Sequence, residues 1–233
     1  MRIWAQSNTA LRTDSRWADY TRAIEAHLNA IKRPDSELRI EGVQKMEKNV
    51  IGSVYQRQRN ALQVVEMGLQ AEQEGYDAFV VLGLGVAGYE ELRDKLKIAV
   101  VYAESAAWNF AVWQYRRFAL LGHESEVYLR RVEQIRVHGS QALFVAGDYC
   151  EFTEQEVLDA FKDPAPMMKM LEASAAHAVR QGARVLIPDF NVLNDLIISA
   201  GVKSFHGVPV MDTGGIALKA AEFLVESRKA GLV

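Results

Sequence analysis

The chain has 233 residues, of which 49% are hydrophobic and 24% charged, and its formal net charge is −3. This composition is typical of one globular domain or two small lobes, and no Lys/Arg cluster points to nucleic acid or an anionic membrane. The only cysteine, Cys150, excludes an internal disulfide. No stretch has the roughly 18 consecutive apolar residues of a membrane helix, and the N-terminal segment lacks the apolar run of a signal peptide. We therefore expect a cytoplasmic protein with no membrane partner.

Short apolar runs alternate with longer amphipathic stretches, which predicts βα units and a parallel sheet. Runs such as AFVVL at 78–82 lack polar alternation, so helices are expected to cover both faces of their strands. In chain order, the expected strands are 2–5, 38–43, 78–82, 98–101, 118–121, 141–146, 184–187 and 208–211. The expected helices are 14–31, 58–74, 89–96, 105–117, 124–136, 153–161, 164–181, 192–200 and 216–229.

A near-repeat organises this pattern. Residues 75–104 and 182–212 each contain a buried strand, a turn, a helix and a second buried strand. Such a duplication predicts an α/β protein with two pseudo-symmetric lobes, the first four strands forming one and the next four the other. Each lobe would hold a four-stranded, mainly parallel sheet flanked by helices, with a cleft between the lobes.

Ligands of open parallel sheets bind beyond the carboxyl ends of the strands, so the turns there are the candidate sites. The first turn, Ser7-Asn8-Thr9, offers hydroxyl groups and an amide that could hold a carboxylate or amide, or it could simply form an Asx-turn or helix cap. The turn GLGVAG at 83–88 lets backbone N–H groups approach an anion. It superficially matches a dinucleotide-binding pattern, but it follows the third strand and no other nucleotide feature accompanies it.

Three further turns carry titratable side chains. Glu104 could be a catalytic carboxylate or simply an acidic residue at a helix N-terminus, and His123 could transfer protons or face solvent. Asp189 follows a buried strand and either faces the cleft or caps the next helix; that helix lowers its pKa, whereas the apolar neighbour Phe190 raises it. The sequence contains no HExxH or CxxC motif, so no metal site is expected.

Four segments, in the same order, resemble the aspartate/glutamate/hydantoin racemase superfamily, which includes maleate isomerases and arylmalonate decarboxylases. RIWAQSNTA (2–10) is similar to the family's strand and N-T turn, and GYDAFVVLGLGVAG (75–88) to its GYDAxxxACxGDPG segment. IAVVYAESAA (98–107) is similar to IPVVGIGEAA, and GVPVMDTGGIALKAAEFL (207–224) to GVPVIDGVAAAVKLAEAL. The resemblance implies that the final helix returns to the first lobe. The implied lobes are 1–102 plus 212–233, and 103–211.

The family's racemases use two cysteines, one on each face of a substrate carbon, to remove and return a proton. The resemblance places the first cysteine position on Gly83 and the second on Phe190, or on Asp189 after a shift of one residue. No thiol stands at any of these positions, so two-thiol racemisation is not expected. Arylmalonate decarboxylases resemble this chain in lacking the first cysteine, which favours chemistry on one side of the substrate.

We expect an isomerase- or lyase-type enzyme that acts on a small carboxylate or cyclic amide in the cleft, by cysteine-independent proton transfer, decarboxylation or isomerisation. Asp189 would transfer the proton, with His123 or Glu104 as a second polar group. The expected substrate-binding residues are Ser7, Asn8, Thr9, Gly83, Gly85, Phe190, Thr213 and Gly214. No cofactor is implied, and a homo-oligomer is open. The alternatives are a hydrolase of a small amide that uses a carboxylate-activated water, and a non-catalytic small-molecule binding protein.

Overall fold

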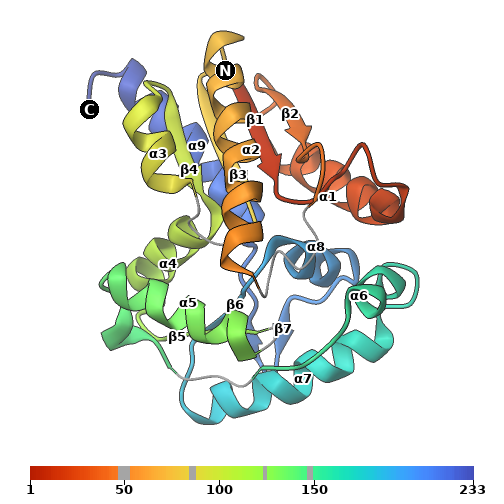
Figure 1. Cartoon of the computed structure of the whole chain (residues 1–233). Coiled ribbons are helices and arrows are strands. Elements are labelled where there is room, and N and C mark those ends of the chain that lie inside the picture. The colour runs from red at the N-terminus through yellow and green to blue at the C-terminus, as the bar shows by residue number, and fades with distance from the viewer. Residues whose placement is uncertain (47–52, 84–87, 123–124, 146–148) are drawn as a thin grey trace. The chain divides into compact units, whose positions relative to one another are not determined.

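The structure is a computed structural model, and it describes residues 1–46, 53–83, 88–122, 125–145 and 149–233, with only the backbone at 125–127. The chain forms two compact units (Figure 1). Unit 1 comprises Met1–Ala106 and Gly214–Val233, and unit 2 comprises Ala107–Thr213. Parallel strands flanked by helices make up both units, which confirms the predicted α/β fold class.

Unit 1 is built on a parallel four-stranded sheet with the strand order β2-β1-β3-β4. All five residues of β3 are buried, as expected for a strand without polar alternation that helices cover on both faces. Because the strands are parallel, the turns that follow them meet at one edge of the sheet. The strands are β1 (Arg2–Ser7), β2 (Glu37–Glu41), β3 (Ala78–Leu82) and β4 (Ala99–Tyr102).

Helices cover both faces of this sheet, with α2 crossing in front of it and α9 behind it in Figure 1. Gly68 of α2 allows close packing, because a Cβ atom there would lie 2.3 Å from Cδ2 of Leu92 on α3. On α9, the Glu222 carboxylate accepts a 2.8 Å hydrogen bond from the Arg33 backbone N–H. The helices are α1 (Ala18–Ile31) after the short 3-10 helix η1 (Ser15–Trp17), α2 (Val54–Gln73), α3 (Tyr89–Lys95) and α9 (Thr213–Lys229).

In the described residues of unit 2, the regular parallel sheet has two strands, β5 (Phe118–Leu121) and β6 (Val185–Pro188), which pair with each other. Single parallel bridges add Phe144 and Tyr149 on the β5 side and Val210 on the β6 side. The order of the four segments follows the predicted layout, and residue 146 of the expected strand at 141–146 lies outside the described residues. Helices α5 to α8 belong to this unit, and α4 enters it from unit 1. Their bounds are α4 (Ala103–Gln114), α5 (Ser125–Val137), α6 (Glu154–Ala160), α7 (Ala165–Arg180) and α8 (Asn191–Ser199).

Two expected strands in unit 2 were wrong in detail. The apolar run at 141–146 begins as the 3-10 helix η2 (Gln141–Leu143). In the run at 208–211, β8 (Val208–Pro209) instead forms an antiparallel hairpin with β7 (Ser204–Phe205). The two residues between β7 and β8, His206 and Gly207, both have positive φ, as a tight two-residue hairpin turn requires. This local turn competes with parallel pairing, so the run joins β6 through a single bridge at Val210, with the Met211 N–H donating to the Leu186 carbonyl at 2.8 Å.

Candidate functional site

The turns after β1 and β3 lie together at the carboxyl edge of the sheet in unit 1. Asn8 N–H donates to the Leu82 carbonyl at 3.4 Å, and Ser7 Oγ accepts from Thr9 N–H at 3.1 Å. The structure therefore brings together four of the predicted binding residues: Ser7, Asn8, Thr9 and Gly83. The Ser7 hydroxyl accepts one hydrogen bond that shapes the turn, and the Asn8 side-chain oxygen has no partner among the described residues.

Gly83 has a φ of +152°, which a residue with a side chain rarely adopts. A Cβ atom at this position would lie 2.7 Å from Asn8 Nδ2 and 3.0 Å from Asn8 Cγ. The Asn8 amide thus fills the space that a side chain at position 83 would need. A side chain at position 83 would therefore have to displace the Asn8 amide.

Among the described residues of unit 1, three buried side-chain amide oxygens have no hydrogen-bond partner: Asn8 Oδ1, Gln56 Oε1 and Asn60 Oδ1. Asn60 Nδ2 donates to the Asn8 carbonyl at 3.4 Å, and Gln56 lies one helical turn before Asn60 on α2. Each unsatisfied buried acceptor costs about 1–3 kcal/mol, so this group of oxygens calls for a donor.

The sequence did not identify Gln56 and Asn60. Both lie on a helix, and the expectation placed the site only in strand-end turns. For Asn60, the one hint in the sequence is that it adjoins Ala61 and precedes Val64, which are buried. A polar residue in such a row becomes informative only when the buried face of the helix is known.

Glu104 is buried in the first turn of α4, directly after β4. Burial raises the pKa of the neighbouring Tyr102 hydroxyl, and the Glu104 charge raises it further. Because Glu104 follows β4 of the parallel sheet, it lies at the same edge as the turns that hold Asn8 and Gly83. Its place in the first turn of a helix also suits the structural role considered for it.

In unit 2, Asp189 follows β6 and is only 2% exposed. Its N–H donates to the Leu121 carbonyl at 3.2 Å, which ties the turn to β5. The N-cap of α8 is Phe190, so Asp189 precedes the cap position. Phe190 is half-buried and contacts Phe152, with ring centroids 6.2 Å apart.

A buried arginine from α5 holds this turn in place. The Nε and Nη2 atoms of Arg131 donate to the Asp189 carbonyl at 3.2 and 2.9 Å, and Nη1 donates to Gln134 at 2.9 Å. A guanidinium group with fixed donor geometry is well suited to such a clamp. The sequence did not indicate that Arg131 is buried, because amphipathic helices also carry arginines on their exposed faces.

We expect Arg131→Met to lower the free energy of unfolding by about 2 kcal/mol, because it leaves the buried Asp189 carbonyl without its donors. The matched control is Arg136→Met on the same helix, whose exposed pair with Glu133 at 3.6 Å should contribute little. Urea unfolding followed by circular dichroism measures both variants. Equal stability of the two variants would show that the clamp adds nothing.

Helix α8 carries a buried polar network beside this turn. Asn191 Nδ2 donates to Asp195 at 2.5 Å, and Asn194 Nδ2 donates to Asp212 at 3.3 Å. The Thr213 N–H donates to Asn194 Oδ1 at 2.8 Å, so this predicted binding residue already uses its backbone donor within the protein. Polar residues at 191, 194 and 195 in an otherwise apolar helix were the sequence signal for this network. Gly214 is buried in the first turn of α9.

Two predicted residues, Gly85 and His123, lie outside the described residues. The thiol of Cys150 lies 3.3 Å from the Gly122 carbonyl, beside the end of β5. Among the residues that the structure describes, no three His, Cys, Asp or Glu side chains are grouped to hold a metal ion. In the same part of the chain, no helix is long and apolar enough to cross a membrane.

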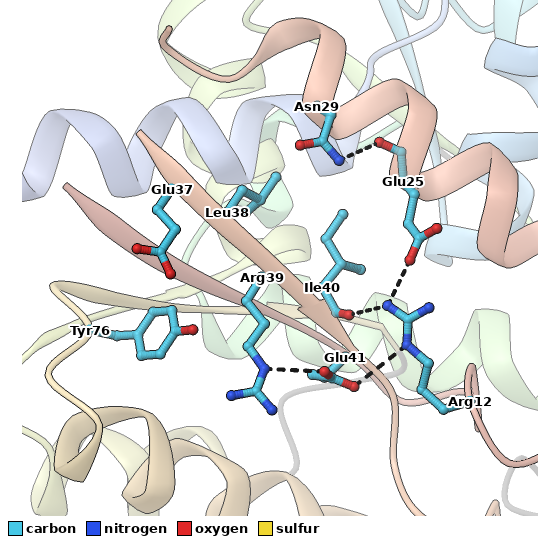
Figure 2. A pocket seen from close by; sticks show the side chains of 9 residues that line it. All are labelled: Arg12, Glu25, Asn29, Glu37, Leu38, Arg39, Ile40, Glu41 and Tyr76. Carbon is cyan, nitrogen blue, oxygen red and sulfur yellow. Dashed lines mark hydrogen bonds and ion pairs between the residues drawn. The ribbon is translucent and has the colours of Figure 1, made fainter. Parts of the chain in front are cut away.

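Unit 1 also has a surface pocket of about 370 Å³ beside the edge strand β2 (Figure 2). Its charged groups form ion pairs: Arg12 pairs with Glu25 at 2.6 Å, Arg39 with Glu41 at 3.1 Å, and Glu37 with Arg2 at 2.9 Å. None of the predicted site residues that the structure describes lines this pocket. We therefore place the candidate site at the strand-end turns.

Comparison with known proteins matches residues 18–187 to the Asp/Glu/Hydantoin racemase family. Allantoin racemase from Klebsiella pneumoniae superimposes with a TM-score of 0.80 at 17% identity, covering 97% of this chain and 88% of that one. Allantoin racemase from Pseudomonas fluorescens gives a TM-score of 0.73 at 21% identity, covering 97% and 91%. A liganded arylmalonate decarboxylase mutant gives 0.61 at 15% identity, covering 96% and 92%. No curated protein sequence matches significantly. The chain therefore belongs to the Asp/Glu/hydantoin racemase family.

Proposed function

We propose that this protein is an isomerase- or lyase-type enzyme whose substrate carries N–H groups beside carbonyl groups, as cyclic amides and ureides do. The observation that carries this proposal is the set of unpaired amide oxygens on Asn8, Gln56 and Asn60. Amide oxygens accept hydrogen bonds and therefore pair with N–H donors, whereas a carboxylate offers only acceptors. Allantoin, named for two of the structural relatives, is such a ureide.

In the proposed reaction, Asp189 removes the proton from the carbon next to a substrate carbonyl. The electron pair of the C–H bond moves to the carbonyl oxygen, and the same carboxyl group or a second acid then returns a proton. Glu104 and His123 stay candidates for that second group. This chemistry requires Asp189 to reach the substrate held by the amides of unit 1, which stays a prediction.

A thermal-shift comparison tests the substrate class. Hydantoin, allantoin and dihydrouracil should raise the melting temperature, whereas malate, aspartate and glutamate should not. Any hit is then incubated in heavy water, where proton transfer from carbon appears as deuterium uptake by NMR. Stabilisation by the dicarboxylates alone would overturn the assignment of the substrate class.

The variant Asn60→Leu separates binding from folding. We expect it to change the free energy of unfolding of the ligand-free protein by less than about 1 kcal/mol, because removing a buried unsatisfied acceptor offsets the loss of the weak 3.4 Å bond from Asn60 Nδ2 to the Asn8 carbonyl. It should also abolish the ligand-induced thermal shift.

The matched control is Gln63→Leu on the same helix. Both ends of the Gln63 amide are bonded to the Lys45 backbone, at 3.1 and 2.9 Å, so this variant should destabilise the protein and keep the thermal shift. If Asn60→Leu destabilised the protein as much as Gln63→Leu, the Asn60 oxygen would have a structural partner and no role as a ligand acceptor.

The crowded environment of Gly83 favours a second candidate function, a binding protein without catalysis. Such a protein would bind the same N–H-bearing compounds and show no deuterium uptake. The hydrolase alternative differs from both, because NMR would then show opening of the ring. The heavy-water experiment therefore distinguishes all three functions in one sample.

A further inference from the structure

The outer face of α2 carries a row of exposed apolar side chains. Tyr55, Leu62 and Leu69 are 66%, 61% and 37% exposed, and they follow one another at intervals of seven residues. Seven residues make almost two helical turns, so the three side chains form one stripe with steps of about 10 Å. The opposite face of α2 packs into the core of unit 1 through Val64 and Ala71. The stripe is therefore additional to what α2 needs for folding.

Two charged residues of opposite sign lie beside the stripe, one before Leu62 and one after it along the helix. Arg59 lies three residues before Leu62, Glu66 lies four residues after it, and both are exposed. A two-fold rotation about an axis at Leu62 would place Tyr55 of one copy opposite Leu69 of the other. The same rotation brings Arg59 of each copy within one residue of the level of Glu66 of the other copy. The stripe and its charges thus complement themselves in an antiparallel arrangement.

We propose that α2 forms a homodimer interface with α2 of a second copy of this chain, antiparallel and centred on Leu62. A self-complementary patch is what a two-fold interface requires, since each residue must meet the symmetry-related surface. In a parallel pair, Arg59 and Glu66 of the two copies would lie on opposite sides of the stripe and would not meet, so the charges favour the antiparallel direction. This inference is independent of the proposed reaction, because none of these side chains belongs to the candidate site.

Sedimentation velocity of the full chain tests the dimer. The wild-type protein should sediment as a dimer, and Leu62→Glu should sediment as a monomer, because it places two carboxylates together at the axis. The control is Leu129→Glu, which changes a 67% exposed leucine on α5 of unit 2 and should leave the dimer intact. A monomeric wild-type protein, or a dimeric Leu62→Glu variant, would overturn the proposal.

Charge exchange tests the antiparallel direction. Arg59→Glu and Glu66→Arg should each weaken the dimer by about tenfold or more, and the double exchange should restore it. Loss of the dimer in the double variant would contradict the antiparallel register. In a Cys150→Ser background, Leu62→Cys should form an intermolecular disulfide on mild oxidation, whereas Leu129→Cys should not. Equal cross-linking at both positions would show random collision and no specific interface.

Discussion

Replacing Asp189 by Asn is expected to lower turnover by at least about 100-fold, the usual effect of removing a general acid or base. The melting temperature should stay the same or rise, because the variant replaces a buried ionisable group with a neutral one of nearly the same size. The N-cap of α8 is Phe190, so the substitution does not remove a helix cap. The measurement is turnover, or deuterium uptake, with a compound identified in the thermal-shift screen.

The control for this variant is Asp159→Asn, an exposed aspartate on α6, which should keep full turnover. Ligand binding by Asp189→Asn should persist, since the amides proposed to bind the substrate lie in unit 1. If Asp189→Asn kept its activity, Asp189 would be removed from the mechanism, and Glu104 and His123 would become the residues to test.

The second large effect concerns the crowding of Gly83 by Asn8. Gly83→Ala is expected to lower the free energy of unfolding by about 3 kcal/mol, because the new Cβ atom meets the Asn8 amide and the backbone has a positive φ. Removing most of that side chain with Asn8→Ala should recover about 1–2 kcal/mol in the double variant. Gly83→Cys meets the same obstacle, so a thiol introduced alone should not produce racemase activity.

A second glycine, Gly139, separates the cost of backbone strain from the cost of steric collision. Gly139 also has a positive φ, but no other part of the described chain lies within 4 Å of a Cβ built on it. Gly139→Ala should therefore show the backbone cost alone, and Asn8→Ala should not relieve it. Additive effects of the Gly83 and Asn8 substitutions in thermal unfolding would mean that Asn8 yields easily and does not exclude a side chain.

The sequence predicted strands most accurately where burial is complete. The strand at 78–82 was predicted to the residue, because a wholly apolar run stands between Asp77 and Gly83. The run at 141–146 is apolar after Gln141, yet among its described residues only Phe144 forms a bridge to β5, since pairing at the side of a sheet depends on the neighbouring strand. Helix α2 begins at Val54, four residues before its expected start, because Ser53 caps it by accepting from the Gln56 N–H.

The candidate site was predictable where chain topology decides the position of a residue. Asp189 and Asn8 follow strands of parallel sheets, and parallel strands bring their carboxyl ends to one edge. Arg131 and Asn60 come from helices, and their contribution depends on which helical face packs inward. That choice arises from tertiary packing, which a single sequence does not reveal.

The return of α9 to unit 1 has a consequence for the order in which the protein folds. Glu222 and Arg228 of α9 bond to residues 189 and 131 positions earlier in the chain, whereas unit 2 is one continuous segment. During synthesis, the whole of unit 2 is made before the helix that covers one face of the sheet of unit 1. The apolar side chains that α9 buries against, such as those around Leu218 and Val225, stay uncovered until that helix is made. We expect this chain to be most prone to aggregate at the stage of synthesis when that face is still uncovered.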